Sequence, residues 1–120
     1  MYIAGLVIPV SADKRDAYRR SAENGAQIFK DSGCLEIAES WEDFVPDGTQ
    51  TDFRPAVAAK AGDRIVFSWQ VLPDKASFYA AETKMHEDGR LDWGGEPPFD
   101  GKRLIIGCFE PVFSIERDQT

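Results

Sequence analysis

The chain has 120 residues, 42% of them hydrophobic and 29% charged, a composition that predicts one globular domain rather than a disordered or collagen-like chain. It carries 14 Lys and Arg against 21 Asp and Glu, so its net charge is −7, and both nucleic acids and anionic membrane surfaces would repel it. No apolar stretch approaches the roughly 20 residues of a membrane span, and no basic leader precedes the first one, so we expect a cytoplasmic protein that binds neither nucleic acid nor membrane.

The first half of the chain predicts a strand, a helix and a second strand. Residues 2–9 are rich in β-forming side chains and alternate as a strand does. Ser11 can cap an amphipathic helix of about five turns, which Gly33 closes at a position that favours a left-handed backbone. The second strand runs from Cys34 to about Trp41, and residues 49–60 are ambiguous between a loop and one or two helical turns.

The second half predicts a strand, a helix and a last strand. The clearest strand runs from Ile65 to Leu72, and Asp74 caps the helix that follows it. A loop rich in Gly and Pro then extends from Gly89 to Gly101, and loops of that length in a small domain are usually functional or mobile. The last strand runs from about Arg103 to Phe113.

The order β-α-β-β-α-β is the split βαβ pattern of ferredoxin-like folds, so we expect an α+β domain with a four-stranded antiparallel sheet. The domain should span residues 1–115, with a frayed tail at residues 116–120. In the usual strand order 4-1-3-2, Cys34 and Cys108 lie on opposite edges of the sheet, ~14 Å apart. A disulfide needs Cα atoms within ~7 Å, so both cysteines should be free thiols.

Both faces of the predicted sheet are apolar, although two helices can cover only one of them. Whichever face the helices cover, at least six large apolar side chains stay uncovered: Ile3, Val7, Val66, Leu72, Ile105 and Phe109. At roughly 1.5–3 kcal/mol each, their burial is comparable with the whole stability of a domain. We therefore expect a homodimer in which the open sheet faces pack together as a dimeric α/β-barrel. The alternative is that residues 44–60 fold over the open face.

The chain offers few residues for a metal or a cofactor. Its two cysteines lack C-x-x-C spacing and it has a single histidine, so we expect no zinc site, no haem and no other cofactor. An all-carboxylate site for magnesium or calcium stays open as an alternative, although no dedicated spacing indicates one. No P-loop, Rossmann, G-x-S-x-G or metalloprotease spacing occurs either.

Six short strings occur over roughly Ile3 to Phe113, and the last is the most specific: Asp13-Lys14-Arg15-Asp16-Ala17-Tyr18, Val45-Pro46-Asp47-Gly48, Thr51-Asp52-Phe53-Arg54, Val66-Phe67-Ser68-Trp69, Lys84-Met85 and Pro98-Phe99-Asp100-Gly101-Lys102-Arg103. In these strings the chain closely resembles the YbaA-like family, a group of small bacterial proteins of unknown function. The resemblance implies the dimeric α/β-barrel superfamily, which includes cofactor-independent monooxygenases and haem enzymes. That fold does not fix a function, and no catalytic residues carry across.

Nine residues could line a ligand pocket, and each also has a plain structural interpretation: Glu39, Trp41, Asp52, Arg54, Tyr79, Glu82, His86, Trp93 and Asp100. On the second helix, Glu82 and His86 are four residues apart, with Tyr79 on the same flank. They could act as a general base with its orienting carboxylate, or they could form an exposed helix pair.

Charged residues outside the helices leave similar alternatives. Arg54 could clamp a substrate carboxylate, or it could pair with a surface acid while Asp52 caps a helical turn. Asp100 precedes Gly101, and an Asp-Gly pair indicates a turn more strongly than it indicates a site residue. If Glu39 faces inward, burial should raise its pKa and make it a candidate acid or base. The alternative is a bulge or an edge-strand position that exposes it.

Trp41 and Trp93 could line a pocket for a flat apolar ligand, and Trp93 lies in the long loop, where a lid would be expected. We therefore expect a homodimer that binds a small organic molecule in a cleft between helices and sheet. If this binding protein is an enzyme, the superfamily resemblance implies cofactor-independent monooxygenase or isomerase activity. The alternative is a non-catalytic binding or regulatory module whose recurring strings maintain fold and pairing.

Overall fold

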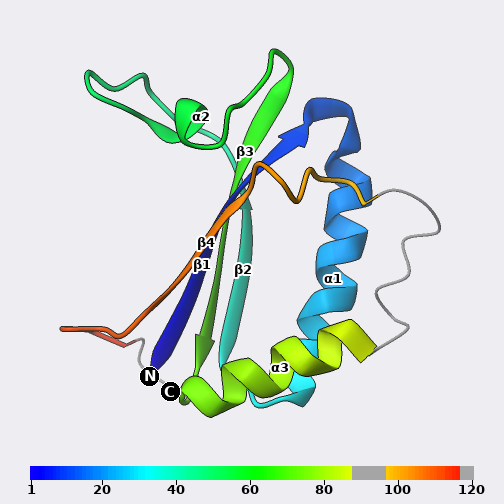
Figure 1. Ribbon diagram of the computed structural model, residues 1–120, viewed down its shortest axis with the longest axis vertical. Coiled ribbons are helices and arrows are strands. Elements are labelled where there is room, and N and C mark those ends of the chain that lie inside the picture. The colour runs from blue at the N-terminus through cyan, green and yellow to red at the C-terminus, as the bar shows by residue number, and fades with distance from the viewer. Residues whose placement is uncertain (88–96, 117–120) are drawn as a thin grey trace.

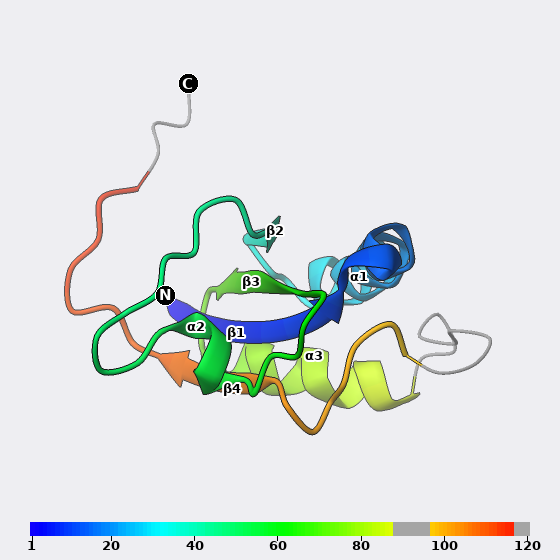
Figure 2. The same cartoon turned by 90° about the horizontal axis from the view of Figure 1, so that it is seen from above.

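A four-stranded antiparallel sheet with two long helices on one side forms the body of the protein (Figure 1). The computed structural model describes residues 1–87 and 97–116. Its elements in chain order are β1 (Tyr2–Ser11), the short 3-10 helix η1 (Ala12–Lys14), α1 (Arg15–Asp31), β2 (Glu36–Trp41), α2 (Phe53–Ala56), β3 (Asp63–Leu72), α3 (Lys75–Glu87) and β4 (Ile105–Phe109). The strand order β2-β3-β1-β4 is the predicted order read from the other edge, and it confirms the α+β class (Figure 2).

Local sequence signals explain where α2 and α3 begin and where α1 ends, whereas the predicted cap by Ser11 is wrong, because its side chain makes no capping hydrogen bond and α1 begins only at Arg15. The carboxylate of Asp74 accepts the backbone N–H three residues further on, at 2.8 Å, and so caps α3. Asp52 accepts a backbone N–H in the same way at 3.0 Å and begins α2, which resolves residues 49–60 in favour of a short helix. Gly33 follows α1 with a φ of 95°, the left-handed conformation predicted for it.

The strand predicted over residues 103–113 is wrong at both ends, because β4 has five residues. Before β4, the N–H groups of Arg103 and Leu104 donate to the carbonyl of Asp100, at 3.2 and 3.3 Å, so a turn holds them away from the ladder. After β4, Pro111 has no N–H to donate to a neighbouring strand. The turn hydrogen bonds before β4 and the proline after it therefore limit the strand, although the apolar pattern continues on both sides.

The register of the strands decides which side of the sheet meets the helices. In β1, the buried residues Tyr2, Ala4 and Ile8 point toward the helices. Tyr2 pairs with Leu72 and Ile8 pairs with Val66, and residues opposite one another share a side of the sheet. Val66 and Leu72 are accordingly buried, so the prediction that they stay uncovered is wrong. The sequence could not decide between the two sides because both are apolar.

Two buried clusters hold the helices against the sheet. The first contains Tyr2, Ala4, Phe29, Leu72, Phe78 and Ala81. The second contains Ile8, Val10, Tyr18 and Val66. Tyr18 and Phe29 are three turns apart on α1, so the stretch of α1 between them spans the distance from one cluster to the other.

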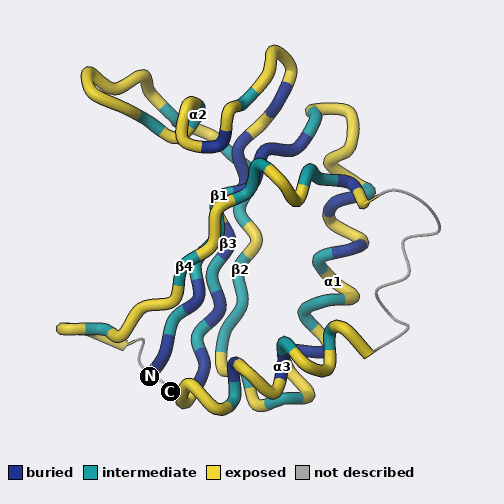
Figure 3. Tube along the Cα trace, in the orientation of Figure 1, coloured by how far each residue is buried: buried dark blue, intermediate teal, exposed yellow. Residues whose placement is uncertain are grey.

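The other side of the sheet is largely open. Alternation along the strands gives it eight large apolar side chains: Ile3, Val7, Ile65, Phe67, Trp69, Val71, Ile105 and Phe109. Phe67, Ile105 and Phe109 are 44%, 46% and 61% exposed. The segment that contains α2 covers only one end of this face, where Val57 and Ile65 are buried (Figure 3). Residues 44–60 therefore cover the open face only at that end, so the alternative in which they cover the whole face is wrong.

A short apolar arm, residues 110–116, follows β4. Its side chains Val112, Phe113 and Ile115 are all exposed. Figures 1 and 2 both draw the arm on the side of the sheet away from α1 and α3. The arm therefore adds apolar surface to the open side. Residues 117–120 of the predicted frayed tail lie outside the described residues.

The topology separates the two cysteines. Cys34 lies just before β2 and Cys108 lies in β4, and these are the two edge strands of the sheet. Both are free thiols, as predicted. Among the described residues, no helix combines the length and the apolar character that a membrane crossing requires.

Candidate ligand pocket between α1 and the sheet

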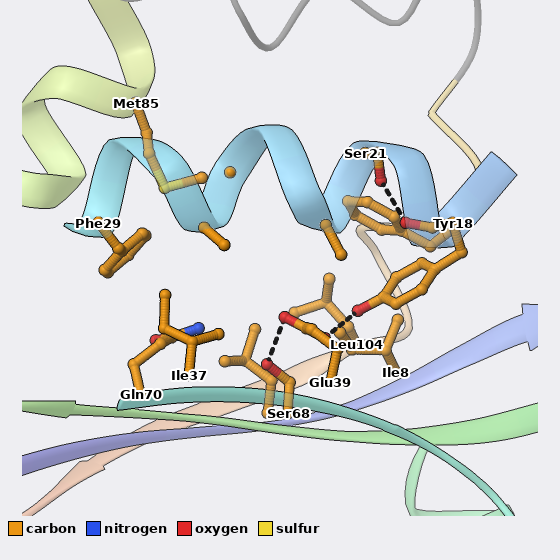
Figure 4. A pocket seen from close by; sticks show the side chains of 15 residues that line it. Ile8, Tyr18, Ser21, Phe29, Ile37, Glu39, Ser68, Gln70, Met85 and Leu104 are labelled. Carbon is orange, nitrogen blue, oxygen red and sulfur yellow. Dashed lines mark hydrogen bonds between the residues drawn. The ribbon is translucent and has the colours of Figure 1, made fainter. Parts of the chain in front are cut away.

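A mainly apolar cavity of about 130 Å³ lies between α1 and the sheet (Figure 4). The face that α1 turns toward it carries the small residues Ala22, Gly25 and Ala26, which are too short to fill the space above the strands. Larger apolar side chains form the remaining walls: Leu6, Ile8, Phe29, Ile37, Met85, Phe99 and Leu104. The cavity thus follows from three small residues on the inner face of one helix.

An outer hollow of about 340 Å³ adjoins this cavity beside β2. The two spaces share five lining residues: Tyr18, Ala22, Ala26, Ile37 and Glu39. Arg15 and Trp41 line only the hollow, and the guanidinium carbon of Arg15 lies 5.4 Å from the centroid of the Trp41 ring, in a cation–π contact. A ligand that entered through the hollow would reach the inner cavity beside Glu39.

Glu39 is the polar centre of the pocket. The hydroxyl of Tyr18 on α1 donates to its Oε2 at 2.6 Å, and the hydroxyl of Ser68 on β3 donates to its Oε1 at 2.8 Å (Figure 4). Glu39 itself lies on β2, so this hydrogen-bonded chain joins three elements. The side chain faces inward yet stays exposed, because β2 is an edge strand and the hollow opens beside it. Each carboxylate oxygen retains acceptor capacity for a ligand.

Tyr18 is fixed as a hydrogen-bond donor. Its burial, the charge of Glu39 and the hydrogen bond to Glu39 all raise the pKa of the Tyr18 hydroxyl, so it stays protonated near neutral pH. One turn along α1, the Ser21 hydroxyl donates to the Tyr18 carbonyl at 3.0 Å. Every buried side-chain nitrogen or oxygen atom of the described residues has a hydrogen-bond partner. The polar groups of the pocket are therefore held in place before a ligand arrives.

Phe99 closes one end of the cavity. Its ring meets that of Tyr18 edge-on, with 6.1 Å between the ring centroids. The loop that carries Phe99 is held by Arg103, which donates to Asp100 at 2.9 Å and to Asp63 of β3 at 2.8 Å. The most specific string of the family resemblance therefore positions a wall of the pocket, and within it Asp100 acts as a turn residue.

The ion pair between Arg103 and Asp63 is mostly buried, with side chains 19% and 8% exposed. Burial opposes the ionisation of Asp63, but hydrogen bonds from Arg103 and from the backbone N–H of Lys60 outweigh it and lower the pKa of this carboxyl. Arg103 also donates to the Ala58 carbonyl at 3.1 Å. These contacts tie the Phe99 loop to the beginning of β3.

Comparison with known proteins places this chain in a family. Residues 1–101 match the model described as "Protein of unknown function (DUF1428)". The chain belongs to the DUF1428 family. It is 48% identical over 112 residues to "Uncharacterized protein YbaA" of Escherichia coli strain K12, a match that covers 92% of this chain and 96% of that protein. The YbaA proteins of Escherichia coli O157:H7 and Shigella flexneri match to the same extent, which confirms the resemblance to YbaA. A solved structure, "De novo designed protein Foldit4", is similar with a TM-score of 0.45 and 14% identity, covering 92% of this chain and 97% of that one, too little to carry an argument.

In this DUF1428 chain, two of the nine predicted site residues line the pocket. These are Glu39, which faces inward, and Trp41, which forms a wall of the outer hollow. Asp100 holds the loop behind Phe99 instead. Trp93 lies outside the described residues.

Asp52 and Arg54 lie at α2, on the opposite side of the sheet from α1 and α3 (Figure 1). Arg54 donates to Glu42 at 2.5 Å, and Glu42 also accepts the backbone N–H of Ile65 at 2.7 Å. Asp52 caps α2 and additionally accepts the backbone N–H of Gly48 at 2.9 Å. These contacts correspond to the structural alternative for both residues rather than to a ligand clamp.

The three candidates on α3 also lie away from the pocket, to which this helix contributes Met85. Tyr79 and His86 are exposed, and the ammonium group of Lys75 lies 5.6 Å from the centre of the Tyr79 ring. Within residues 1–87 and 97–116, no hydrogen bond or ion pair joins Glu82 to His86. The proposed base and its orienting carboxylate are thus not paired.

Two central residues of the pocket, Tyr18 and Ser68, are absent from the predicted set. Ser68 and Gln70 are buried polar residues on the side of β3 that meets the helices. Their position between the apolar Val66 and Leu72 is a signal of a polar site, because burying polar side chains on a core-facing strand costs free energy. That signal required knowledge of which side faces inward.

Metal ligands do not gather in this pocket. In the part of the chain that the structure describes, no group of three His, Cys, Asp or Glu side chains is arranged to hold a metal ion. The polar side chains that line the inner cavity are Tyr18, Ser21, Glu39, Ser68 and Gln70.

Proposed function

We propose that this DUF1428 protein binds a small organic molecule in the pocket beneath α1, with Glu39 as its polar anchor. The observation that supports the proposal is a carboxylate held by two hydroxyl groups in a cavity whose other walls are mainly apolar. Ligand sites combine apolar walls with a few well-placed polar groups in this way. Glu39 faces this cavity while remaining open to the outer hollow, so a ligand that enters through the hollow can reach its carboxylate.

The size of the pocket limits the ligand. An engineered protein cavity of roughly 150 Å³ holds a benzene molecule. The inner cavity of about 130 Å³ therefore suits a single ring or a short branched chain, with substituents that extend into the outer hollow. Because a carboxylate only accepts hydrogen bonds, the ligand should present a hydroxyl or amino proton to Glu39.

As an enzyme, the protein would catalyse a reaction that begins with proton transfer from the ligand. Glu39 takes a proton from the ligand, while the hydroxyls of Tyr18 and Ser68 fix the position of the carboxylate. A base that returns the proton to another atom of the ligand catalyses isomerisation. The same deprotonation is the first step of a cofactor-independent monooxygenase, with O₂ as co-substrate. The alternative is a binding or regulatory module that uses the same pocket without turnover.

Thermal unfolding and tryptophan fluorescence test the binding. In a panel of small phenols, cyclic alcohols and amines, some compounds should raise Tm, since a ligand at 100 times its Kd stabilises the folded state by roughly 2.7 kcal/mol. Glu39→Gln preserves the shape of the side chain and should weaken these compounds about tenfold. Glu82→Gln, on α3 and outside the pocket, is the control and should change nothing. A broad panel that moves neither signal contradicts the proposal.

Product analysis separates the enzyme from the binding module. Any bound compound that the wild-type protein converts should remain unconverted with Glu39→Gln at concentrations that still saturate the variant. Bound compounds that stay unchanged with the wild type favour the module.

We also propose that two copies pair through their open sheet faces and close a dimeric α/β-barrel. The support is the apolar surface of Phe67, Ile105 and Phe109, which stays exposed although Phe53 of α2 meets the edge of Phe67, and which the arm after β4 extends. A two-fold axis brings the same patch of each copy together, so an apolar face is complementary to itself. Packed sheets lie ~10 Å apart, and their side chains would exclude water from this face.

A further inference from the structure

We infer that the ligand of this pocket is a small carboxylic acid, whose carboxylate binds Arg15 at the entrance while a hydroxyl or amino group at the other end of the molecule donates to Glu39. The inference rests on the proposed binding function and names its ligand class. It comes from the two charged groups of the pocket that have no ion-pair partner within residues 1–87 and 97–116, and from the wall between them.

Arg15 is held at the entrance in a geometry that suits anion binding. It is the first residue of α1, and its guanidinium carbon lies 5.4 Å from the centre of the Trp41 ring. Contact with an aromatic ring restrains the guanidinium group, while its N–H donors keep the planar fork that carboxylates bind. Within the described part of the chain, no acidic side chain forms an ion pair with Arg15.

Four charged side chains line the outer hollow: Arg15, Arg19, Glu23 and Glu39. Arg19 and Glu23 neutralise one another, since Nε of Arg19 lies 3.0 Å from Oε1 of Glu23. Arg15 and Glu39 remain, with opposite charges. Among the described residues, the groups that bond to Glu39 are two neutral hydroxyl groups rather than a cation. The pocket is therefore positive at its entrance and negative at its centre.

This separation of charge sets the orientation of the ligand. A carboxylate would be repelled by Glu39 and attracted by Arg15, so it stays at the entrance. The apolar body of the molecule then lies along Trp41, Ile37 and the small residues of α1. At its inner end, a hydroxyl or amino proton reaches the free acceptor sites of Glu39. The matching class is a hydroxy or amino acid built on one ring or a short branched chain.

Calorimetric titration with 4-hydroxyphenylacetate and its primary amide tests the inference on the intact protein. The two compounds share the ring and the hydroxyl group, and the second carries a neutral carboxamide of the same shape in place of the charged carboxylate. The acid should bind at least tenfold more tightly than the amide. Raising NaCl from 0.05 to 0.5 M should weaken the acid several-fold and leave the amide unchanged, because salt screens an exposed charge pair.

Two arginine variants complete the test. Arg15→Met should remove the advantage of the acid over the amide, while Arg20→Met, an exposed residue of α1 that does not line the pocket, should preserve it. Equal affinity of acid and amide for the wild type, or an advantage that survives Arg15→Met, overturns the carboxylic-acid inference and leaves the binding function intact. If neither compound binds and the neutral panel also fails, the pocket itself is not a ligand site and both proposals are wrong.

Discussion

The hydroxyl of Tyr18 donates a hydrogen bond of 2.6 Å to the carboxylate of Glu39, and this bond joins α1 to the edge strand β2. The two residues are 21 positions apart in sequence. Between Tyr18 and Phe29, the side chains with which α1 lines the cavity are small, so little apolar packing holds the middle of the helix. The bond therefore contributes both to the pocket and to the position of the helix above it.

Tyr18→Phe should lower the free energy of unfolding by about 1–2 kcal/mol. The variant keeps the ring and loses a hydrogen bond to a charged group, and the exposure of Glu39 to water reduces the loss below the value for a fully buried pair. Urea denaturation measures the change. Tyr79→Phe is the control on an exposed ring and should stay within about 0.5 kcal/mol of the wild type. Equal effects of the two variants would contradict the role of the Tyr18 bond.

The stability of the protein should depend on Tyr18 in alkaline solution. Its pKa is raised in the folded state, so its contribution is complete below the unfolded value of about 10. Above that pH the unfolded chain releases the proton while the folded chain keeps it, and stability falls by about 1.4 kcal/mol per pH unit. Urea denaturation between pH 9 and 11 should give a smaller decline for Tyr18→Phe. Parallel curves for the two proteins would refute the raised pKa.

Arg103→Met should destabilise the protein by about 3 kcal/mol, because it leaves Asp63 mostly buried without its cation. The matched control is Arg19→Met, which removes an exposed pair with Glu23 and should cost less than about 0.5 kcal/mol. The pKa of Asp63 is lowered, so its contribution is present above the ordinary carboxyl pKa of about 3.9 and disappears as the pH falls through its folded value. The difference between wild type and Arg103→Met should therefore shrink below about pH 4 in chemical denaturation. A difference that is constant with pH would assign the loss to packing alone.

Phe67→Glu should separate the proposed dimer. It places a charge in the centre of the open face, where pairing would bury it without a partner. Sedimentation at low micromolar concentration should show two subunits for the wild type and one for the variant. Leu35→Glu changes an exposed apolar residue next to β2 and should remain dimeric. A wild-type protein that sediments as a folded single subunit would rule out the pairing and the barrel.

Most elements of the fold could be predicted from local chemistry. Asp52 and Asp74 identify the beginnings of two helices, and Gly33 identifies the end of a third, because these signals act within a few residues. The strand order also follows from the sequence of elements, and with it the separation of Cys34 from Cys108.

The side of the sheet that meets the helices could not be predicted. Alternation has a period of two, and it identifies an inner face only when the other face is polar. Here Val66 and Phe67 are adjacent, both are apolar, and only the first is buried. For the same reason the sequence does not identify Ser68 as a pocket residue, because its position acquires meaning only once Val66 and Leu72 are known to face the helices. The bond from Tyr18 to Glu39 depends on tertiary structure and leaves no local pattern.

Glu42 directly follows β2 and fixes the register of that strand against β3. Its backbone N–H and its carboxylate both bond to Ile65, at 2.9 and 2.7 Å, and Arg54 holds the other carboxylate oxygen. A slip of one residue would turn every side chain of β2 to the opposite face, and Ala38 or Ser40 would replace Glu39 under α1. Arg54 lies behind the sheet and touches nothing in the pocket, yet by preventing that slip it keeps an acid there instead of a methyl or a hydroxyl group.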